Sequence, residues 1–486
     1  MTRTIKSSSP ALNVPYELTF KIFLLCLPRN TRVRPNRRTA PLLLAQICSR
    51  WRVITFSLPE LWNSLFLDFD RRVQYDGISA MLGFESYPVE ATIVTLVDCW
   101  LSRAASYPLS ITITCTDPSR SLPPNLIQLL ASKSRQLGRL ELRISKSDLE
   151  ILNDIISGPF PMLQTLAFSV AGPVAVLADH FRPRTSWNRE FLLSSPNLKA
   201  LRLGPSLWEG FPSGITDGLI TSVTAVEFPT KEPDSAKFWN ILRAFPHIEH
   251  AKIWTRFGAG GVSSNVTTIG LKTLVLPHGS FVLNHLRAPY LSALDVSVGG
   301  EESLAITSFL RRSECTLTSL HIRIWARSGW DVCLAVAPSV IEFTLTLNSS
   351  NESPQTYFQV LENPNILPIL RTLKMRFFPD YDCAQVYDGF FSVLGSRARR
   401  RSLIDAELVL IHSQEEPPHP PIVEDLREVH SLRGNGMHIV LGTQRTRKKF
   451  HGDFLPYQED ADGYDIFDTP TPLPVCFAPF QLNSSA

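Results

Sequence analysis

The chain has 486 residues, of which 44% are hydrophobic and 19% are charged. A chain of this length and apolar content can bury a large core, so disorder throughout is excluded. Lysine and arginine total 48 against 45 acidic residues, a net charge of +3, so there is no bulk charge to hold a nucleic-acid backbone or an anionic membrane.

The sequence favours a protein of the cytoplasm, the nucleus or both. No apolar run approaches the roughly 20 residues needed to cross a bilayer. The first 13 residues are polar and lack the apolar stretch of a secretory signal. The eight cysteines are scattered without C-x-x-C spacing, so we expect neither a zinc site nor a disulfide framework.

The first seventy residues show the spacing of short amphipathic helices. Pro15 stands where a helix can begin, and Leu18 and Ile22 recur at helical spacing. The predicted elements are a helix at 13–27, a basic link at 28–40, a helix at 41–55, a short element from Pro59 and a strand at 64–69.

These helices carry large apolar side chains on more than one face. So small a module buries little surface on its own, which favours a docking surface. An amphipathic cap on the following domain explains the same pattern, and periodicity alone does not separate the two.

Residues 13–62 resemble an F-box of the type abundant in fungi. The resemblance is carried by Val14-Pro15, Glu17-Leu18, Ile22, Leu27-Pro28, Leu42 to Leu44, Cys48-Ser49-Arg50-Trp51-Arg52 and Leu61-Trp62, of which C-x-x-W-R followed by L-W is the most specific part. The link at 28–40 is longer than the turn typical of the family.

The resemblance implies a three-helix module that interlocks with a Skp-type adaptor, which a cullin scaffold carries. Proteins of this family are substrate receptors of SCF ubiquitin ligases, and the resemblance implies no chemistry of their own. The positions carried over, at or beneath the adaptor interface, are Pro15, Leu18, Ile22, Leu43, Leu44 and Trp51.

Beyond residue 75 the pattern φ-x-x-φ-x-φ, where φ is apolar, recurs ten times. Its copies begin at intervals of 20 to 35 residues, at positions 137, 163, 198, 223, 248, 271, 291, 317, 340 and 370. Most intervals fit the roughly 20 to 29 residues of a leucine-rich repeat. We expect an entry helix at about 88–105, a strand at 109–115, and helices between later copies, as at 301–312.

The predicted fold class is therefore α/β: an N-terminal F-box at 10–70, an irregular leucine-rich-repeat-like solenoid with a parallel sheet at 75–411, and an irregular, partly disordered tail at 412–486. Alternation of apolar residues also occurs in any half-buried strand, and the asparagine that usually follows the strand in this repeat family is absent from every copy. We therefore expect uneven curvature.

In such a solenoid the x positions of the strands line one face of the sheet. The residue types that dominate binding energy there are Trp254, Arg323, Trp325, Arg376 and Phe378. A basic cluster of Lys252, His321, Arg323, Lys374 and Arg376 favours an acidic or phosphorylated protein partner. The alternative is a solvated sheet face with its aromatic residues beneath a loop.

The common hydrolase, metalloprotease and nucleotide-binding motifs are absent. The glycine cluster at 258–261 and the basic run from Arg397 to Arg401 are interpreted as a loop and a solvated helix end. We expect no enzyme, cofactor or metal. The predicted function is an SCF substrate receptor, and the alternatives are a repeat scaffold without a ligase role and an enzyme with an unrecognised pocket.

Overall fold

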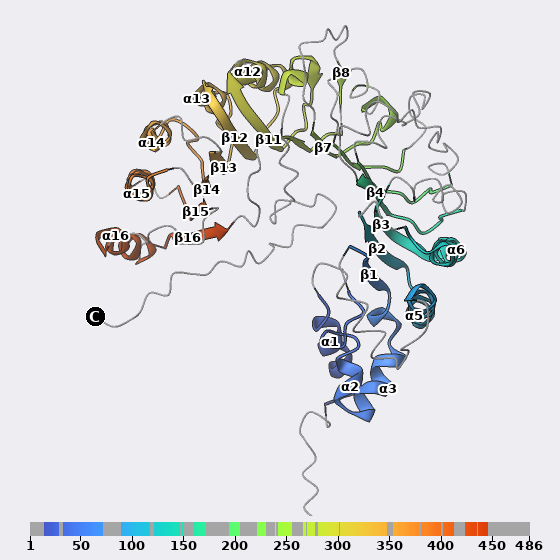
Figure 1. The fold of residues 1–486 in the computed structure, drawn as a ribbon. Coiled ribbons are helices and arrows are strands. Elements are labelled where there is room, and N and C mark those ends of the chain that lie inside the picture. The colour runs from blue at the N-terminus through green and yellow to red at the C-terminus, as the bar shows by residue number, and fades with distance from the viewer. Residues whose placement is uncertain are drawn as a thin grey trace, which may run out of the picture. The chain divides into compact units, whose positions relative to one another are not determined.

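The computed structural model is an α/β protein whose strands pair in parallel (Figure 1). Its contacts divide the chain into unit 1, Met1–Val223, and unit 2, Thr224–Ala486. The structure describes residues 14–28, 33–70, 89–116, 121–145, 148, 159–171, 194–204, 221–229, 239, 242–254, 266–268, 270–277, 280–300, 302–347, 353–378, 381–399, 402–412, 423–434 and 436–445.

Unit 1 begins with a helical module, made of α1 (Tyr16–Leu25), α2 (Leu44–Ile47), α3 (Ser49–Ser57) and the 3-10 turn η2 (Pro59–Leu61). Helix α1 starts as predicted, with Pro15 at its N-cap. The single helix predicted at 41–55 is wrong. Cys48 is extended, with φ −157° and ψ 168°, which ends α2, and its Sγ accepts the N–H of Trp51 at 3.4 Å to begin α3.

Two tryptophans join the helical module to the first repeat. Trp62 is fully buried, and its Nε1–H donates to the carbonyl of Thr55 at 2.9 Å. Its ring meets that of Trp100, on α5 (Val89–Arg103), edge to face at 4.8 Å between centroids. Trp100 Nε1–H in turn donates to the carbonyl of Ser64 at 3.1 Å. The module and the first repeat therefore share one core.

The long link between α1 and α2 packs along strand β1 (Ser64–Asp68). The N–H of Phe66 donates to the carbonyl of Val33 at 2.7 Å. The guanidinium of Arg34 lies 3.4 Å from the carboxylate of Asp68 and 4.5 Å from the centroid of the Phe66 ring. These contacts cover the edge of β1 that does not pair with the next strand, and a free edge is a site of unwanted pairing.

In unit 1 the strands pair in sequence order, β1–β2–β3–β4–β5, all parallel. Strand β1 thus pairs within the sheet. The entry helix and strand occur where they were predicted. The elements after β1 are α5, β2 (Leu109–Cys115), α6 (Pro124–Ser132), η3 (Ser134–Gln136), β3 (Leu137–Ser145), β4 (Thr165–Ala171) and β5 (Ala200–Leu203).

Unit 2 continues the pattern, with the strand order β6–β7–β9–β11–β12–β13–β14–β15–β16, again all parallel. A small outer pair, β8–β10, is also parallel. The elements are β6 (Ala225–Pro229), β7 (His250–Trp254), β8 (Val266–Thr267), β9 (Thr273–Leu276), η4 (Ser280–His285), β10 (Leu286–Arg287), β11 (Ala293–Gly300), α12 (Glu302–Ser313), β12 (Ser319–Ser328), α13 (Trp330–Ala335), β13 (Glu342–Leu347), α14 (Pro354–Glu362), β14 (Thr372–Phe377), α15 (Cys383–Ala398), β15 (Asp405–His412), α16 (Val423–Gly434) and β16 (His438–Arg445).

A backbone ladder aligns the entries of successive strands. In unit 2 one carbonyl of most repeats accepts two successive N–H groups of the next repeat, at 2.7 to 3.0 Å, and the carbonyl of Ile404 accepts one, from His438, at 2.8 Å. The carbonyls that act in this way are those of Thr224, Glu249, Lys272, Ser292, Thr318, Ile341 and Arg371. In unit 1 the carbonyl of Gln164 does the same. The main chain thus satisfies its own polar groups at the strand entries without the asparagine of the repeat family.

Arg397 was predicted to lie at a solvated helix end, but it is buried, with 1% of its surface exposed. Its guanidinium donates to the carbonyls of Leu361, Asn363, Ile366 and Leu367 at 2.7 to 3.1 Å. A planar five-donor group suits such a cluster of carbonyls. It joins the end of α14 to α15.

The array extends beyond residue 411, where the sequence predicted an irregular tail. Helix α16 and strand β16 form a further repeat, and β16 pairs with β15 at eight positions. Among the described side chains of α16, Val429 and Leu432 are buried. Because so few apolar residues of this helix face the core, its amphipathic periodicity in the sequence is weak. The predicted tail from 452 and the glycine cluster at 258–261 lie outside the described residues.

Gly389 allows α15 to pack closely against α14. A Cβ there would overlap the ring of Phe358, which is itself fully buried. We predict that Gly389→Ala lowers the free energy of unfolding by about 1 to 3 kcal/mol, because overpacking outweighs the gain in helix propensity. Chemical denaturation measures this change. Gly434→Ala, at a helical position where a Cβ meets nothing within 4 Å, is the matched control and should not destabilise.

Candidate interaction surfaces

The helical module exposes large apolar side chains that its own core leaves uncovered. Leu18 and Ile22 on α1 are 51% and 45% exposed, and Leu25 is 84% exposed. We define the helical surface as Tyr16, Leu18, Ile22, Leu25, Leu43, Ile47, Val53 and Phe56. Eight such residues lie within 16–56, against six in all the other described residues. Concentration on one small module is what distinguishes a docking surface from scattered apolar residues.

The six residues carried over from the F-box pattern fall into two groups. Pro15, Leu18, Ile22 and Leu43 are exposed. Leu44 is buried at 3% exposure. Trp51 is half-buried and meets the buried ring of Phe23 edge to face at 5.0 Å. The first group can contact a partner directly, whereas Leu44 and Trp51 hold the helices together beneath it.

Polar and aromatic contacts link the helical module to the residues at the end of α5. The guanidinium of Arg103 lies 4.8 Å from the ring centroids of both Phe56 and Trp62. The hydroxyl of Tyr107 donates to a carboxylate oxygen of Glu60 at 2.5 Å, and this bond is the main cause of the raised pKa of Tyr107. Cation–π and charge-assisted contacts of this kind fix the orientation of the groups they join.

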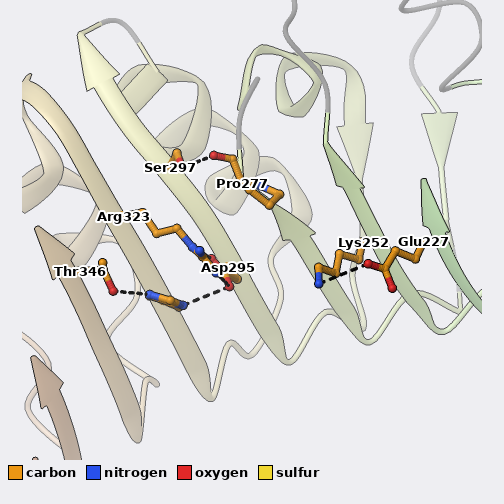
Figure 2. A network of polar contacts seen from close by, with 8 residues as sticks. Glu227, Lys252, Pro277, Asp295, Ser297, Arg323 and Thr346 are labelled. Carbon is orange, nitrogen blue, oxygen red and sulfur yellow. Dashed lines mark hydrogen bonds and ion pairs between the residues drawn. The ribbon is translucent and has the colours of Figure 1, made fainter. Parts of the chain in front are cut away.

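The second candidate surface is the sheet face lined by the x positions of the repeats in unit 2. Its charged side chains meet across neighbouring strands (Figure 2). Glu227 on β6 and Lys252 on β7 occupy paired positions, with 3.3 Å between Oε1 and Nζ. Lys374 on β14 and Glu407 on β15 are also paired, at 3.7 Å. Opposite charges at such positions stabilise a strand pair.

The centre of this face is a four-residue cluster, which we call the inner-face network (Figure 2). Asp295 on β11 accepts two hydrogen bonds from Arg323 on β12, at 3.0 and 2.9 Å. The same carboxylate lies 3.0 Å from Nδ1 of His321, whose Nε2 lies 2.9 Å from the hydroxyl of Thr346 on β13. Three adjacent strands are thereby joined through side chains.

Burial and charge set the ionisation of this network. Burial opposes the charged form of Asp295, but His321 and Arg323 nevertheless hold the pKa of its carboxyl well below the usual range. Burial is the main cause of the lowered pKa of His321, to which Arg323 and Arg376 add and which Asp295 opposes. The network therefore holds an ionised carboxylate beside a neutral imidazole near neutral pH.

Carboxylate, imidazole and hydroxyl follow one another here in the order used by nucleophilic hydrolases. Thr346 is 7% exposed, however, and Arg323 occupies both oxygens of Asp295. The strands around it pair in register through their main chains, so their N–H groups serve the sheet and not an oxyanion. The arrangement stabilises the sheet and presents no accessible nucleophile.

The predicted target-binding residues are therefore only partly brought together. Arg323 is engaged by Asp295, and Arg376 is half-buried on β14. The N–H of Phe378 donates to the carbonyl of Leu347. The side chains of Trp254 and Trp325 lie outside the described residues. Because Lys252, Arg323 and Lys374 each face a carboxylate, the attraction of this face for an acidic segment is lower than the basic residues alone suggested.

Neither a protein-family model nor a curated protein sequence matches this chain. In the described part of the chain, no group of three or more His, Cys, Asp or Glu side chains could hold a metal ion. Nor does a described helix combine the length and apolar character required to cross a bilayer. The two surfaces are therefore the features of this molecule that bear on its function.

The carboxylate of Asp295 should be essential for the stability of unit 2. Asp295→Asn leaves the guanidinium of Arg323 without its counter-charge, at side-chain exposures of 15% and 22%. We predict a loss of about 2 to 3 kcal/mol in the free energy of unfolding. Asp405→Asn, in an exposed pair with His438, should change it by less than about 0.5 kcal/mol. Urea denaturation compares the two, and equal effects would contradict the assignment.

The lowered pKa of His321 predicts a loss of stability in acid. The unfolded chain takes up a proton at a pH near the ordinary value of 6.5, whereas the folded chain does so at lower pH. Stability is therefore complete above that value and falls as the pH decreases toward the folded pKa. His321→Gln should reduce this slope by up to about 1.4 kcal/mol per pH unit.

Proposed function

We propose that this chain is a substrate-recognition subunit of an SCF-type ubiquitin ligase. The helical surface docks onto a Skp-type adaptor, which a cullin carries, and the x-position face of the repeats binds a target protein. The chain supplies no catalysis. It works by proximity, because holding a target lysine near a charged conjugating enzyme makes a bimolecular encounter effectively intramolecular.

One observation carries the proposal: the helical module leaves eight large apolar side chains uncovered while it buries others, such as Trp62 and Phe23, completely. A module that served only as a cap would direct its apolar surface toward the repeat that it covers. Here one set of side chains, including Trp62, packs on the first repeat, and a second set, including Leu18 and Ile22, faces outward. The resemblance of residues 13–62 to an F-box suggests that the partner that covers these exposed side chains is a Skp-type adaptor.

The test is capture of the full chain by purified, immobilised Skp-type adaptor. Leu18→Asp and Ile22→Asp should each weaken capture by at least tenfold, because burying a leucine-sized side chain is worth about 1.5 to 3 kcal/mol and a buried carboxylate adds a further cost. Both residues are exposed, so the fold should survive. Trp51→Ala is less informative, since Trp51 packs on Phe23.

Leu304→Asp is the matched control. Leu304 is 68% exposed on α12, outside the helical surface, so this change introduces the same charge at another exposed leucine. Capture of Leu304→Asp should equal that of the wild type. Failure of the adaptor to capture the wild-type chain would remove the ligase role.

A non-enzymatic repeat scaffold is the second candidate, and one observation favours it. The shared core of Trp62 and Trp100 shows that the helical module also closes the end of the sheet, as a cap must. A scaffold of this kind would bind its partner through the repeats and would ignore the adaptor. The preference for an acidic or phosphorylated target stays a prediction under either function.

A further inference from the structure

The helical surface lies among positively charged side chains. Within the described residues 14–28 and 33–57 the chain carries six lysines and arginines and one acidic residue, Glu17. These residues sum to +5, and because the whole chain has a net charge of +3, all its other residues sum to −2. Arg34 faces Asp68 on β1. The five other cations are exposed, and they are Lys21, Arg37, Arg38, Arg50 and Arg52.

On α1 one of these cations lies within the apolar stripe. Lys21 follows Leu18 by three residues and precedes Leu25 by four, spacings that place side chains on one face of a helix. All three side chains are exposed. Glu17, one turn before Lys21, is exposed as well. The outward face of α1 thus presents an ammonium group between two leucines.

Two further cations border other parts of the helical surface. The N–H of Leu43 donates to the carbonyl of Thr39 at 2.9 Å, which places the neighbouring Arg38 at the turn before α2. Arg50, on α3, donates from its guanidinium to the carbonyl of Val14 at 3.2 Å. Its charge therefore lies beside the start of α1. Positive groups from three segments of the module thus border one apolar surface.

We propose that the adaptor receives the helical surface in an apolar groove bordered by carboxylates, and that these opposite charges speed its association. This acidic groove belongs to the adaptor assigned above, so its existence rests on the proposed function. Surface charges of a soluble protein are normally mixed in sign, and a cluster of one sign repels itself. Carboxylates on a partner remove that repulsion and attract the module from a distance.

An anionic membrane combines the same two chemistries, but the arrangement of side chains favours a protein. A helix that lies in a membrane interface separates an apolar face from a cationic face. On α1, however, Lys21 shares the face of Leu18 and Leu25. The helical module also consists of short helices, of 10, 4 and 9 residues. Its apolar side chains therefore suit separate pockets of a protein better than a continuous layer of lipid.

Charge and apolar contact should act on different rate constants. Charges at the rim of an interface act mainly on the association rate and are screened by salt, whereas most other interface contacts act on the dissociation rate. Lys21→Glu and Arg38→Glu should therefore slow association, while Leu18→Asp should mainly speed dissociation. The side chains of Lys21 and Arg38 are exposed, so both charge variants should fold.

The test measures association of the full chain with purified, immobilised Skp-type adaptor at low and at high salt. At about 0.01 M salt the screening length is about 30 Å, and at about 1 M it is about 3 Å. The association rate of the wild type should fall by about tenfold or more between the two. Lys21→Glu and Arg38→Glu should each slow association by about threefold to tenfold at low salt, and by little at high salt.

Arg311→Glu is the matched control and should associate as the wild type does. Arg311 is exposed on α12, outside the helical module, so this variant has the same net charge as the other two. Equal slowing in all three variants would overturn the inference, because overall charge and not the module would then attract the adaptor. Circular dichroism of each variant before the assay shows whether it is folded.

Three other outcomes would also count against an acidic groove. An association rate of the wild type that does not depend on salt would overturn this inference alone. No binding of the wild type to the adaptor at either salt would overturn the proposed function as well. Binding of the wild type to phosphatidylserine vesicles that is lost in both Arg38→Glu and Leu18→Asp would assign the helical surface to a membrane instead.

Discussion

The backbone ladder at the strand entries is the constraint on which this structure depends. Each of the eight carbonyls named above binds two N–H groups of the following repeat, so the strand that follows starts at a fixed height relative to its neighbour. Intervals of 20 to 35 residues are compatible with this because the extra residues lie between the strands, where an insertion costs little. Parallel pairing in sequence order follows from the ladder.

A fixed height for each strand decides which side chains meet on the sheet face. Glu227 and Lys252 occupy paired positions, and Lys374 and Glu407 do likewise. Each lysine therefore lies in space beside an acid that belongs to a neighbouring strand, 25 or 33 residues away in the sequence. The carboxylate of Asp295 contacts both His321 and Arg323. Their charges are therefore used largely within the sheet, where they align neighbouring strands.

The helical module combines capping with an uncovered surface. Trp62 and Trp100 join it to the first strand, and the long link adds a main-chain hydrogen bond from Phe66 to Val33. Leu18, Ile22 and Leu25 face outward from the same helices. The helical module shares its core with the first repeat of unit 1. A partner bound to the exposed residues would therefore have an orientation relative to the first strands that this packing determines.

The sequence by itself determined the repeats, because apolar residues that recur in the same short pattern along the chain face a shared core. The ten predicted strands, the entry helix and α12 are all present. It also indicated which residues of the helical module are large and apolar, but not that Leu44 is buried while Leu43 is exposed. It missed α16 and β16, whose few buried side chains leave little pattern. The tertiary structure decided the neutralisation of Arg323 and the burial of Arg397, because both depend on residues that come together only when the repeats stack.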